Sequence, residues 1–371
     1  MLPLLAPLLL ASLHLSNALP NPQATTEDTL IILDKGVGHR STPVPRWRTS
    51  LRRLSPRGTN ATILTQFEAA TNATQRSEPI NAYALTYSAS TSTLFSATGQ
   101  GIIRTATDGS DATLILQEDS SEAGLDKITS VHVAEKEQKI YYGTQYQGLI
   151  KKADLDGSNV EIVLNVSQGL NLGFASPSYK PAKFYAGGIV VDEETGWLYW
   201  SAARGDKDGS IRRAALKGTD GGEEQHQVLA SGINMPGQVR IVGGSLYWVE
   251  RGRWSNSPTA IKYLDRALLA LPATGTSAAL ATGTLVHASQ SALFFEKDYT
   301  GERQTLGIQS FVVDRREREM RVWFVVESSG RTMFGKLVRV GWRGGGRGPV
   351  FEVLNEDTRE VGVPVGLEFL R

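Results

Sequence analysis

The chain has 371 residues and a net charge of +1, from 39 basic and 38 acidic side chains. This balance excludes a nucleic-acid or acidic-membrane binder that works through a strong basic excess. The absence of cysteine excludes disulfides, thiol catalysis and cysteine-bound metals, so stability has to come from one large buried core.

The first predicted element is a signal peptide at residues 1–18. Residues 2–15 are almost wholly apolar, and Ser16-Asn17-Ala18 follows as a small-residue cleavage pattern. The apolar run is too short to cross the ~30 Å hydrocarbon layer as a helix. We therefore expect cleavage after Ala18, a linker over residues 19–28, and a secreted protein. A short N-terminal anchor is the alternative, because no Lys or Arg precedes the apolar run.

Beyond the leader, no apolar run is long enough to span a membrane, so none is expected in the mature chain. Three Asn-x-Ser/Thr sequons begin at Asn60, Asn72 and Asn165. Behind a signal peptide, sequons indicate the secretory pathway, and these three asparagines are the predicted N-glycosylation sites.

A repeated unit of β-strands begins near residue 29. Six short segments are dominated by the β-branched and aromatic residues that strands prefer. They are residues 30–33, 94–97, 140–143, 198–201, 246–249 and 322–325. A second strand follows each, usually with a basic residue two positions after an aliphatic one, as in Ile150 and Lys152. The fifth unit, near 268–271, lacks the base.

Glycine turns, outer strands and preceding strands complete the units. The turns contain Gly58, Gly109, Gly157, Gly218, Gly275 and the run 344–346, where glycine permits the positive φ of a tight turn. The predicted outer strands are 61–65, 112–117, 160–165, 227–231, 278–282 and 350–355. The predicted strands that precede units two to six are 81–87, 130–134, 188–192, 239–242 and 310–314.

The first unit has no preceding strand, whereas a spare strand, residues 365–370, follows the last unit. A circular array has this offset when the C-terminal strand supplies the missing strand of the first unit, which limits exposed sheet edges. The sequence therefore predicts an all-β fold. It is a monomeric six-bladed β-propeller over residues 29–371, with four-stranded antiparallel blades, closed by the C-terminal strand joining the first blade.

The units resemble the YWTD repeats of low-density-lipoprotein-receptor type six-bladed propellers. Residues 149–159 match the third strand and turn of that family, and Tyr199-Trp200-Ser201-Ala202 and Tyr247-Trp248-Val249-Glu250 are the nearest forms of the tetrapeptide. Its acidic position is kept only at Asp34 and Glu250, so the chain resembles a divergent member. The resemblance implies binding of protein ligands, although the cysteine-rich modules that usually flank such propellers have no counterpart in a chain without cysteine.

Long loops lie on one face of the predicted propeller. With strands lettered A to D from the channel outwards, the D-to-A and B-to-C loops share this face, and loops on a rigid scaffold often carry binding residues. Tyr, Trp and Arg are frequent in binding interfaces. The candidate binding residues are Arg46, Trp47, Tyr146, Tyr179, Tyr185, Arg204, Arg251, Arg253 and Trp254. We expect a protein or glycan ligand; packing of these rings within their own loops is the alternative.

The aromatic residues of the repeats have a different expected role. Because they recur at a fixed place in each unit, we expect them to pack between blades. They are Tyr141, Tyr199, Trp200, Tyr247, Trp248, Trp323 and Phe324.

Two other functions remain open. One is a calcium-dependent, lactonase-like hydrolase with its site at the central channel, and the other is an extracellular structural protein without a specific small ligand. The weak metal candidates are Asn81, Asn234, Glu296, Glu368, Asp206 and Asp208. The chain has no Gly-x-Ser-x-Gly elbow for a hydrolase triad. No catalytic residue is assigned and no cofactor is expected, with calcium as the alternative.

Overall fold

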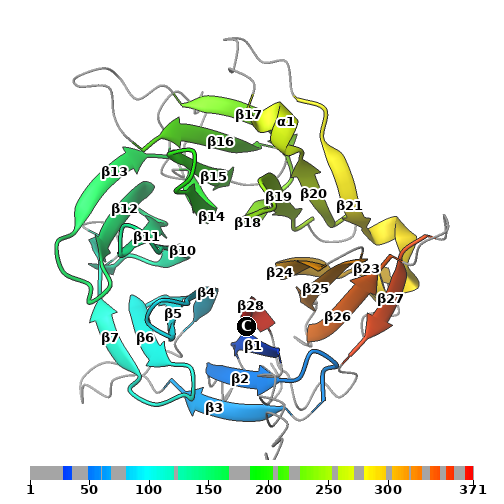
Figure 1. Cartoon of the computed structure of the whole chain (residues 1–371), viewed down its shortest axis with the longest axis horizontal. Coiled ribbons are helices and arrows are strands. Elements are labelled where there is room, and N and C mark those ends of the chain that lie inside the picture. Colours follow the sequence, from blue (N-terminus) through cyan, green and yellow to red (C-terminus); the bar gives the residue numbers. More distant parts are fainter. Residues whose placement is uncertain are drawn as a thin grey trace, which may run out of the picture.

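The computed structural model describes residues 28–35, 49–59, 61–67, 81–120, 124–166, 184–203, 208–216, 226–252, 258–270, 280–297, 303–316, 319–327, 335–342, 348–354 and 364–370. These residues form six four-stranded antiparallel sheets around a central axis (Figure 1). The predicted six-bladed β-propeller is confirmed.

Each blade has its innermost strand at the channel and its outermost strand at the rim. From the channel outwards, blade 1 contains β28 (Pro364–Leu370), β1 (Thr29–Asp34), β2 (Ser50–Leu54) and β3 (Thr62–Gln66). Blade 2 contains β4 (Ala82–Ser88), β5 (Thr93–Thr98), β6 (Ile102–Ala106) and β7 (Thr113–Leu116). Blade 3 contains β10 (Ile128–Ala134), β11 (Lys139–Thr144), β12 (Leu149–Asp154) and β13 (Glu161–Asn165).

The other three blades follow the same order. Blade 4 contains β14 (Tyr185–Asp192), β15 (Trp197–Ala203), β16 (Gly209–Ala215) and β17 (Gln227–Ile233). Blade 5 contains β18 (Pro236–Val242), β19 (Ser245–Glu250), β20 (Ala260–Leu264) and β21 (Gly283–His287). Blade 6 contains β24 (Gly307–Arg316), β25 (Glu319–Glu327), β26 (Gly335–Gly341) and β27 (Val350–Val353).

Short elements lie between some of the strands, within blade 5 or between consecutive blades. They are the ribbon of β8 (Asp119–Ser120) and β9 (Gly124–Leu125), the helix α1 (Arg266–Leu269), the 3-10 turns Ala288–Gln290 and Ala292–Phe294, and the ribbon of β22 (Phe295–Lys297) and β23 (Arg303–Thr305).

The ring is closed by the two ends of the described chain. Strand β28 pairs antiparallel with β1, with Leu30 opposite Phe369 and Ile32 opposite Leu367. In Figure 1 this red strand lies against the blue strand β1, on the channel side of blade 1. The first blade thus gains its inner strand from the C-terminal end, as the sequence predicts.

The hydrophobic core lies between neighbouring blades. Each of six buried clusters combines side chains of two adjacent blades, and one of them joins blade 6 to blade 1. All the repeat aromatics are at most 2% exposed, which confirms their predicted packing role. The blades are therefore held together mainly by apolar contact across each interface.

Carboxylates on the A-to-B turns add polar contacts between blades. Glu135, just after β10, accepts hydrogen bonds from the backbone N–H of Ala89 (2.6 Å) and the hydroxyl of Ser90 (2.5 Å), both in the turn of blade 2. Glu193, just after β14, likewise accepts from the backbone N–H groups of Lys136 (2.7 Å) and Glu137 (3.0 Å). These hydrogen bonds connect the turns of blades 2, 3 and 4 to one another.

The outer half of blade 5 differs from the predicted one. Its third strand is β20 instead of a strand near 268–271, and its fourth strand is β21 instead of 278–282. Ile261 is fully buried and Tyr263 takes the position of the expected base, so the aliphatic-base signal is absent where the strand lies. The segment 266–269 forms α1, which turns Leu269 (8% exposed) towards the core.

Candidate functional site

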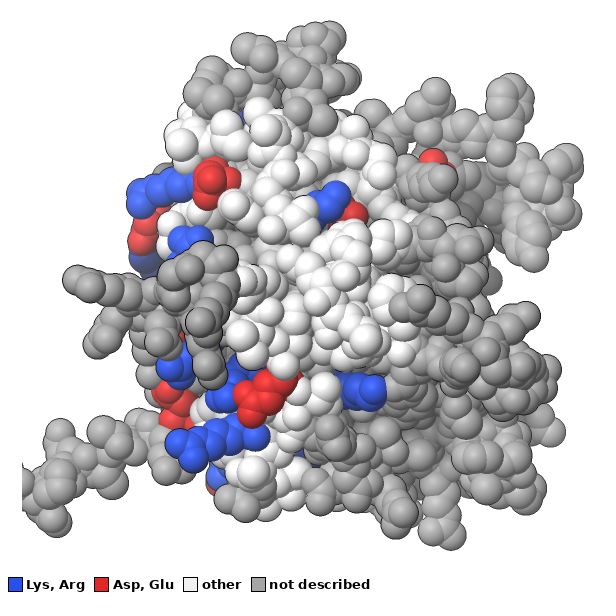
Figure 2. Space-filling view, turned by 90° about the vertical axis from the view of Figure 1, so that its right-hand side faces the viewer, with Lys and Arg blue, Asp and Glu red and all other residues white. Residues whose placement is uncertain are grey.

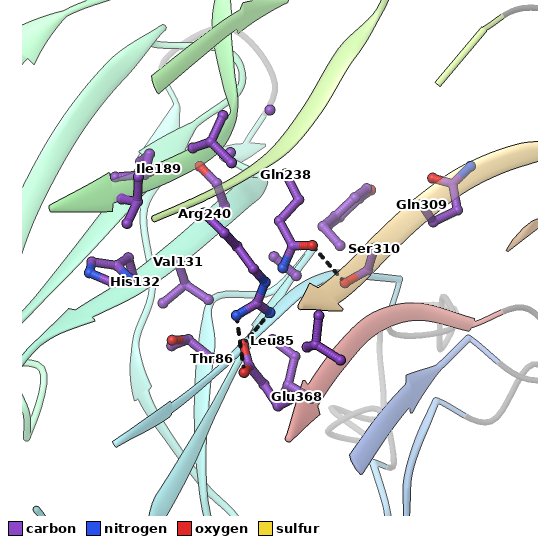
Figure 3. A pocket seen from close by; sticks show the side chains of 18 of the residues that line it. Leu85, Thr86, Val131, His132, Ile189, Gln238, Arg240, Gln309, Ser310 and Glu368 are labelled. Atoms are coloured by element: carbon purple, nitrogen blue, oxygen red, sulfur yellow. Dashed lines mark hydrogen bonds and ion pairs between the residues drawn. The ribbon is translucent and has the colours of Figure 1, made fainter. Parts of the chain in front are cut away.

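The inner strands of all six blades enclose a central cavity of about 250 Å³ (Figure 3). Its wall is formed by β28, β4, β10, β14, β18 and β24. Much of this wall is aliphatic, with polar groups at a few places. Those polar groups determine what the channel can hold.

An ion pair crosses the channel from blade 5 to blade 1. The guanidinium of Arg240 donates to both carboxylate oxygens of Glu368, at 2.6 and 3.2 Å, and also to the carbonyl oxygen of Leu367 at 2.8 Å (Figure 3). Burial raises the pKa of Glu368, and the charge of Arg240 opposes that shift. The only carboxylate in the channel wall, among the described residues, is therefore occupied by an internal cation.

His132 also lines the channel. Burial, aided by the nearby charge of Arg240, lowers the pKa of its imidazole to about 4. The ring is therefore neutral at physiological pH, and its role there is that of an uncharged polar group.

A hydrogen-bonded chain links the inner strands of blades 5, 6 and 1. The side-chain oxygen of Gln238 accepts from the hydroxyl of Ser310 (3.0 Å) and from the backbone N–H of Phe311 (2.9 Å). The Ser310 oxygen in turn accepts from the backbone N–H of Leu367 (3.0 Å). These bonds hold the closing strand β28 in place and make this part of the channel structural.

A second group of side chains lies where the A strands begin and the B strands end. Neighbouring strands are antiparallel, so these positions share one face of the ring, that of the D-to-A and B-to-C loops. We call the group the channel mouth, and it contains one or two residues from every blade. Its members are Lys35, Tyr83, Lys127, Tyr146, Tyr185, Arg251 and Glu327.

Tyr83 of blade 2 lies between cations of the two adjacent blades. The ammonium of Lys35 is 5.8 Å from the centre of the Tyr83 ring, within the range of a cation–π interaction. Lys127 lies near enough to the Tyr83 hydroxyl to act on its pKa, and the Lys127 ammonium lies 5.7 Å from the centre of the Tyr146 ring. Burial raises the pKa of Tyr83, and the charge of Lys127 opposes this rise.

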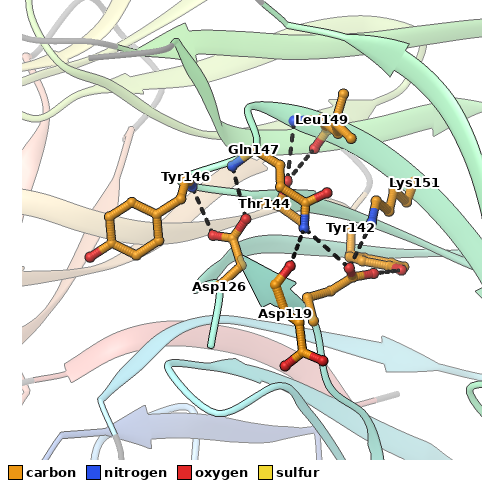
Figure 4. Close-up of polar contacts among 9 residues, drawn as sticks. Asp119, Asp126, Tyr142, Thr144, Tyr146, Gln147, Leu149 and Lys151 are labelled. Carbon is orange, nitrogen blue, oxygen red and sulfur yellow. Dashed lines mark hydrogen bonds and ion pairs between the residues drawn. The ribbon is translucent and has the colours of Figure 1, made fainter. Parts of the chain in front are cut away.

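The turn that presents Tyr146 is held by buried carboxylates (Figure 4). Asp126 is fully buried and accepts from the backbone N–H groups of Tyr146 (2.7 Å) and Gln147 (2.9 Å). Glu118 accepts from Lys151 at 2.6 Å and from the Tyr142 hydroxyl. Tyr146 therefore stands on a turn whose backbone is fixed before any ligand arrives.

Arg251 completes the cationic side of the channel mouth. Its Nε is buried and has no hydrogen-bond partner among the described residues. A Cβ atom on Gly237 would come within 2.7 Å of this Nε, so glycine there makes room for the guanidinium. Arg251 also borders the cavity, and its charge contributes to a lowered pKa of Lys35.

Three of the candidate binding residues lie in this group: Tyr146, Tyr185 and Arg251. The others, Arg46, Trp47, Tyr179, Arg204, Arg253 and Trp254, lie outside the described residues. The sequence does not single out Lys35, Tyr83, Lys127 or Glu327. The only feature of the sequence that could have identified them is their position at the ends of predicted strands. Using that feature requires the exact ends of those strands to be known.

The metal candidates whose side chains the structure describes do not lie together. Of those whose side chains are described, only Glu368 lines the channel, whereas Asn81 and Asp208 are exposed and Asn234 is half-buried. Asp206 and the side chain of Glu296 lie outside the described part. Within that part, no group of three or more His, Asp or Glu side chains could hold a metal ion.

Asn165 is exposed at the end of β13, while Asn60 and Asn72 lie outside the described residues. A search of the described helices finds none with the length and apolar character needed to cross a bilayer.

The fold and the channel define a six-bladed β-propeller, and comparison with known proteins finds similar chains. The low-density lipoprotein receptor-related protein 1 of Pyricularia oryzae is 28% identical over 172 residues, which are 45% of this chain and 54% of that protein. The chain thus spans about half the length of the curated relative that it matches. No known family profile matches the chain.

Among solved structures, the YWTD propeller of nidogen in a nidogen–laminin complex has a TM-score of 0.52. It is 13% identical, over 92% of this chain and 98% of that one. A periplasmic gluconolactonase of Pseudomonas aeruginosa has a TM-score of 0.48 at 12% identity, over 93% and 99% of the two chains. The nidogen propeller shares the fold of this chain, and the fungal relative is similar in sequence to part of it.

Proposed function

We propose that this protein is a binding module that recognises a protein partner through the face on which the channel mouth lies. One observation carries the proposal: every blade contributes a charged or aromatic side chain to the mouth. Tyrosines and an arginine that are already fixed in place are typical centres of protein interfaces.

On the side of the ring shown in Figure 2, Lys and Arg lie next to Asp and Glu, and most of the described surface is uncharged. The nidogen structure, a complex with laminin, shows that a propeller of this architecture occurs in a protein complex. It supports the general mode of action and says nothing of the partner of this chain.

Photo-crosslinking from two faces tests the proposal. A benzophenone amino acid replaces Tyr146 at the channel mouth or, as the control, exposed Glu194 on the A-to-B turn of blade 4. Both variants are incubated with the extracellular proteins of the source cells. We expect an adduct of defined mass from position 146 alone, removed by excess unmodified protein but not by a Tyr83→Ala, Tyr185→Ala competitor. Equal adducts from both positions, or competition by that double variant, would contradict the proposal.

A calcium-dependent hydrolase makes a different prediction about stability. A cation at Glu368 would have to displace the guanidinium of Arg240 and leave that charge buried and unpaired, which is costly. We therefore expect the same melting temperature in millimolar calcium and in chelator. A site filled at one hundred times its Kd would add about 2.7 kcal/mol to the free energy of unfolding, so a clear upward shift in calcium would favour the hydrolase.

We also propose that the protein is secreted, on the basis of the apolar leader and the exposed sequon at Asn165. Mass spectrometry of the protein recovered from the medium should show Leu19 as its first residue and a glycan at Asn165. A chain that keeps residues 1–18 and stays with the membrane fraction would instead favour the N-terminal anchor.

A further inference from the structure

Among its described residues, the channel mouth contains more cations than carboxylates. Lys35, Lys127 and Arg251 come from blades 1, 3 and 5, and Glu327 of blade 6 is the one described acid whose charge acts on Lys35. No ion pair between Lys35 and Glu327 is formed, so this acid acts from a distance. The positive charge of Arg251 therefore acts on Lys35, and Glu327 opposes it without forming an ion pair.

Three other described acids that lie close to the mouth are already engaged. Asp34 pairs with Arg52 and Glu250 pairs with Lys262, each at 3.0 Å. Each of these two acids, which are kept from the repeat pattern, therefore neutralises a cation of its own blade. The carboxylate of Asp126 is turned to two backbone N–H groups and is fully buried. None of the three is available to the cations of the mouth without breaking these contacts.

Lys35 has no such direct partner among the described residues. Its side chain is half-buried and makes no hydrogen bond or ion pair with any described residue. Burial lowers the pKa of its ammonium and Arg251 lowers it further, while Glu327 raises it. A half-buried cation beside another cation is destabilising unless an anion joins it.

We infer that the channel mouth binds a carboxylate side chain, Asp or Glu, of a partner protein, between Lys35 and Arg251. This inference rests on the proposed binding function. A guanidinium and an ammonium form short, charge-assisted hydrogen bonds with a carboxylate. Tyr83 and Tyr146 would flank the incoming segment with ring surface, and Lys127 adds a third positive charge.

Amine acetylation measures the environment of Lys35 directly. The full mature protein is treated with limiting acetic anhydride at mildly alkaline pH, and mass spectrometry compares Lys35 with Lys136, which is exposed on the opposite face. The probe is the blocked tripeptide acetyl-Gly-Asp-Gly-amide, with its Asn counterpart as the uncharged control and inorganic phosphate as a free anion. An adjacent carboxylate that raises the pKa of Lys35 by about one unit lowers its free amine about tenfold.

We therefore expect the Asp peptide to slow acetylation of Lys35 about tenfold relative to Lys136, and the Asn peptide to leave it unchanged. Arg251→Gln should abolish most of this protection, whereas Arg339→Gln, whose guanidinium pairs with Glu352 in the outer part of blade 6, should keep it. Melting temperatures show whether each variant is folded.

Other outcomes would overturn the inference. Equal protection by the Asp and Asn peptides would mean that charge is not recognised, and protection by phosphate alone would point to a free anion. If the Asp peptide gave no protection but position 146 gave a specific adduct, the inference of a bound carboxylate would be wrong. The proposed binding function would still hold. Failure of both experiments would remove the proposed function as well.

Discussion

Trp248→Ala should lower the free energy of unfolding by about 3–5 kcal/mol, the usual cost of removing a large aromatic ring from a core. Trp248 is fully buried and belongs to the cluster that joins blades 4 and 5. Because that interface is one link of a closed ring, its loss weakens the whole molecule. Chemical denaturation followed by tryptophan fluorescence measures the change.

Trp197→Ala is the matched control for this prediction. Trp197 packs against the same cluster but is only partly buried, and Arg213 lies 4.4 Å from its ring centre. We expect it to cost about 2 kcal/mol, since its partial burial and the cation–π contact with the buried Arg213 are lost. Equal losses for the two variants would contradict the view that the fixed repeat positions carry the packing between blades.

Gly157→Ala is the second substitution with a large expected effect. Gly157 has φ +88° in the turn after β12, and a Cβ atom there would come within 2.0 Å of the carbonyl oxygen of Ile115 in blade 2. The backbone conformation costs about 1–2 kcal/mol for an L-residue, and the collision adds about 1–3 kcal/mol. We therefore expect a loss of about 3 kcal/mol in denaturation experiments.

Gly196→Ala separates the cost of the backbone conformation from the cost of the collision. Gly196 also has a positive φ, +73°, but a Cβ atom there would have no neighbour within 4 Å. It should cost about 1 kcal/mol through backbone strain alone. If Gly157→Ala cost no more than Gly196→Ala, the close approach of blade 3 to blade 2 at this turn would be disproved.

The fold can be predicted because the same requirement, burial of a strand between two blades, acts on six segments of the sequence. Each B strand is buried between two blades, so its apolar and aromatic residues recur regardless of the local surroundings. The spare strand at 365–370 is visible for the same reason. The prediction is wrong in the outer half of blade 5 because Tyr263 replaces the expected base and the Leu-rich segment at 268–271 resembles a strand more than Ala260–Leu264 does.

The channel cannot be predicted because its contacts join residues far apart in the chain. Arg240 and Glu368 are separated by 128 positions, and nothing near either residue indicates the other. The place of Glu368 on an inner strand makes it a candidate metal ligand, and its arginine partner appears only in three dimensions. The sequence thus places Glu368 near an inner strand and contains no information about its charge environment.

The residues of the channel mouth can be predicted in part from the sequence. Tyr146, Tyr185 and Arg251 are predicted because Tyr and Arg on loops are common in interfaces, and they lie among the residues of the mouth. Lys35, Tyr83 and Lys127 border strands and resemble ordinary strand-end residues in sequence. Only their common position at one end of six blades makes them a group.

Hydrogen exchange on the complex with the partner captured by crosslinking tests the central claim most directly. The account predicts slower amide exchange on binding at residues 145–148, 184–186 and 251–252, which surround the channel mouth. It predicts unchanged exchange in the opposite turns at 135–138 and 193–196. Protection confined to those opposite turns, or to the outer strands, would contradict the assignment of the binding face.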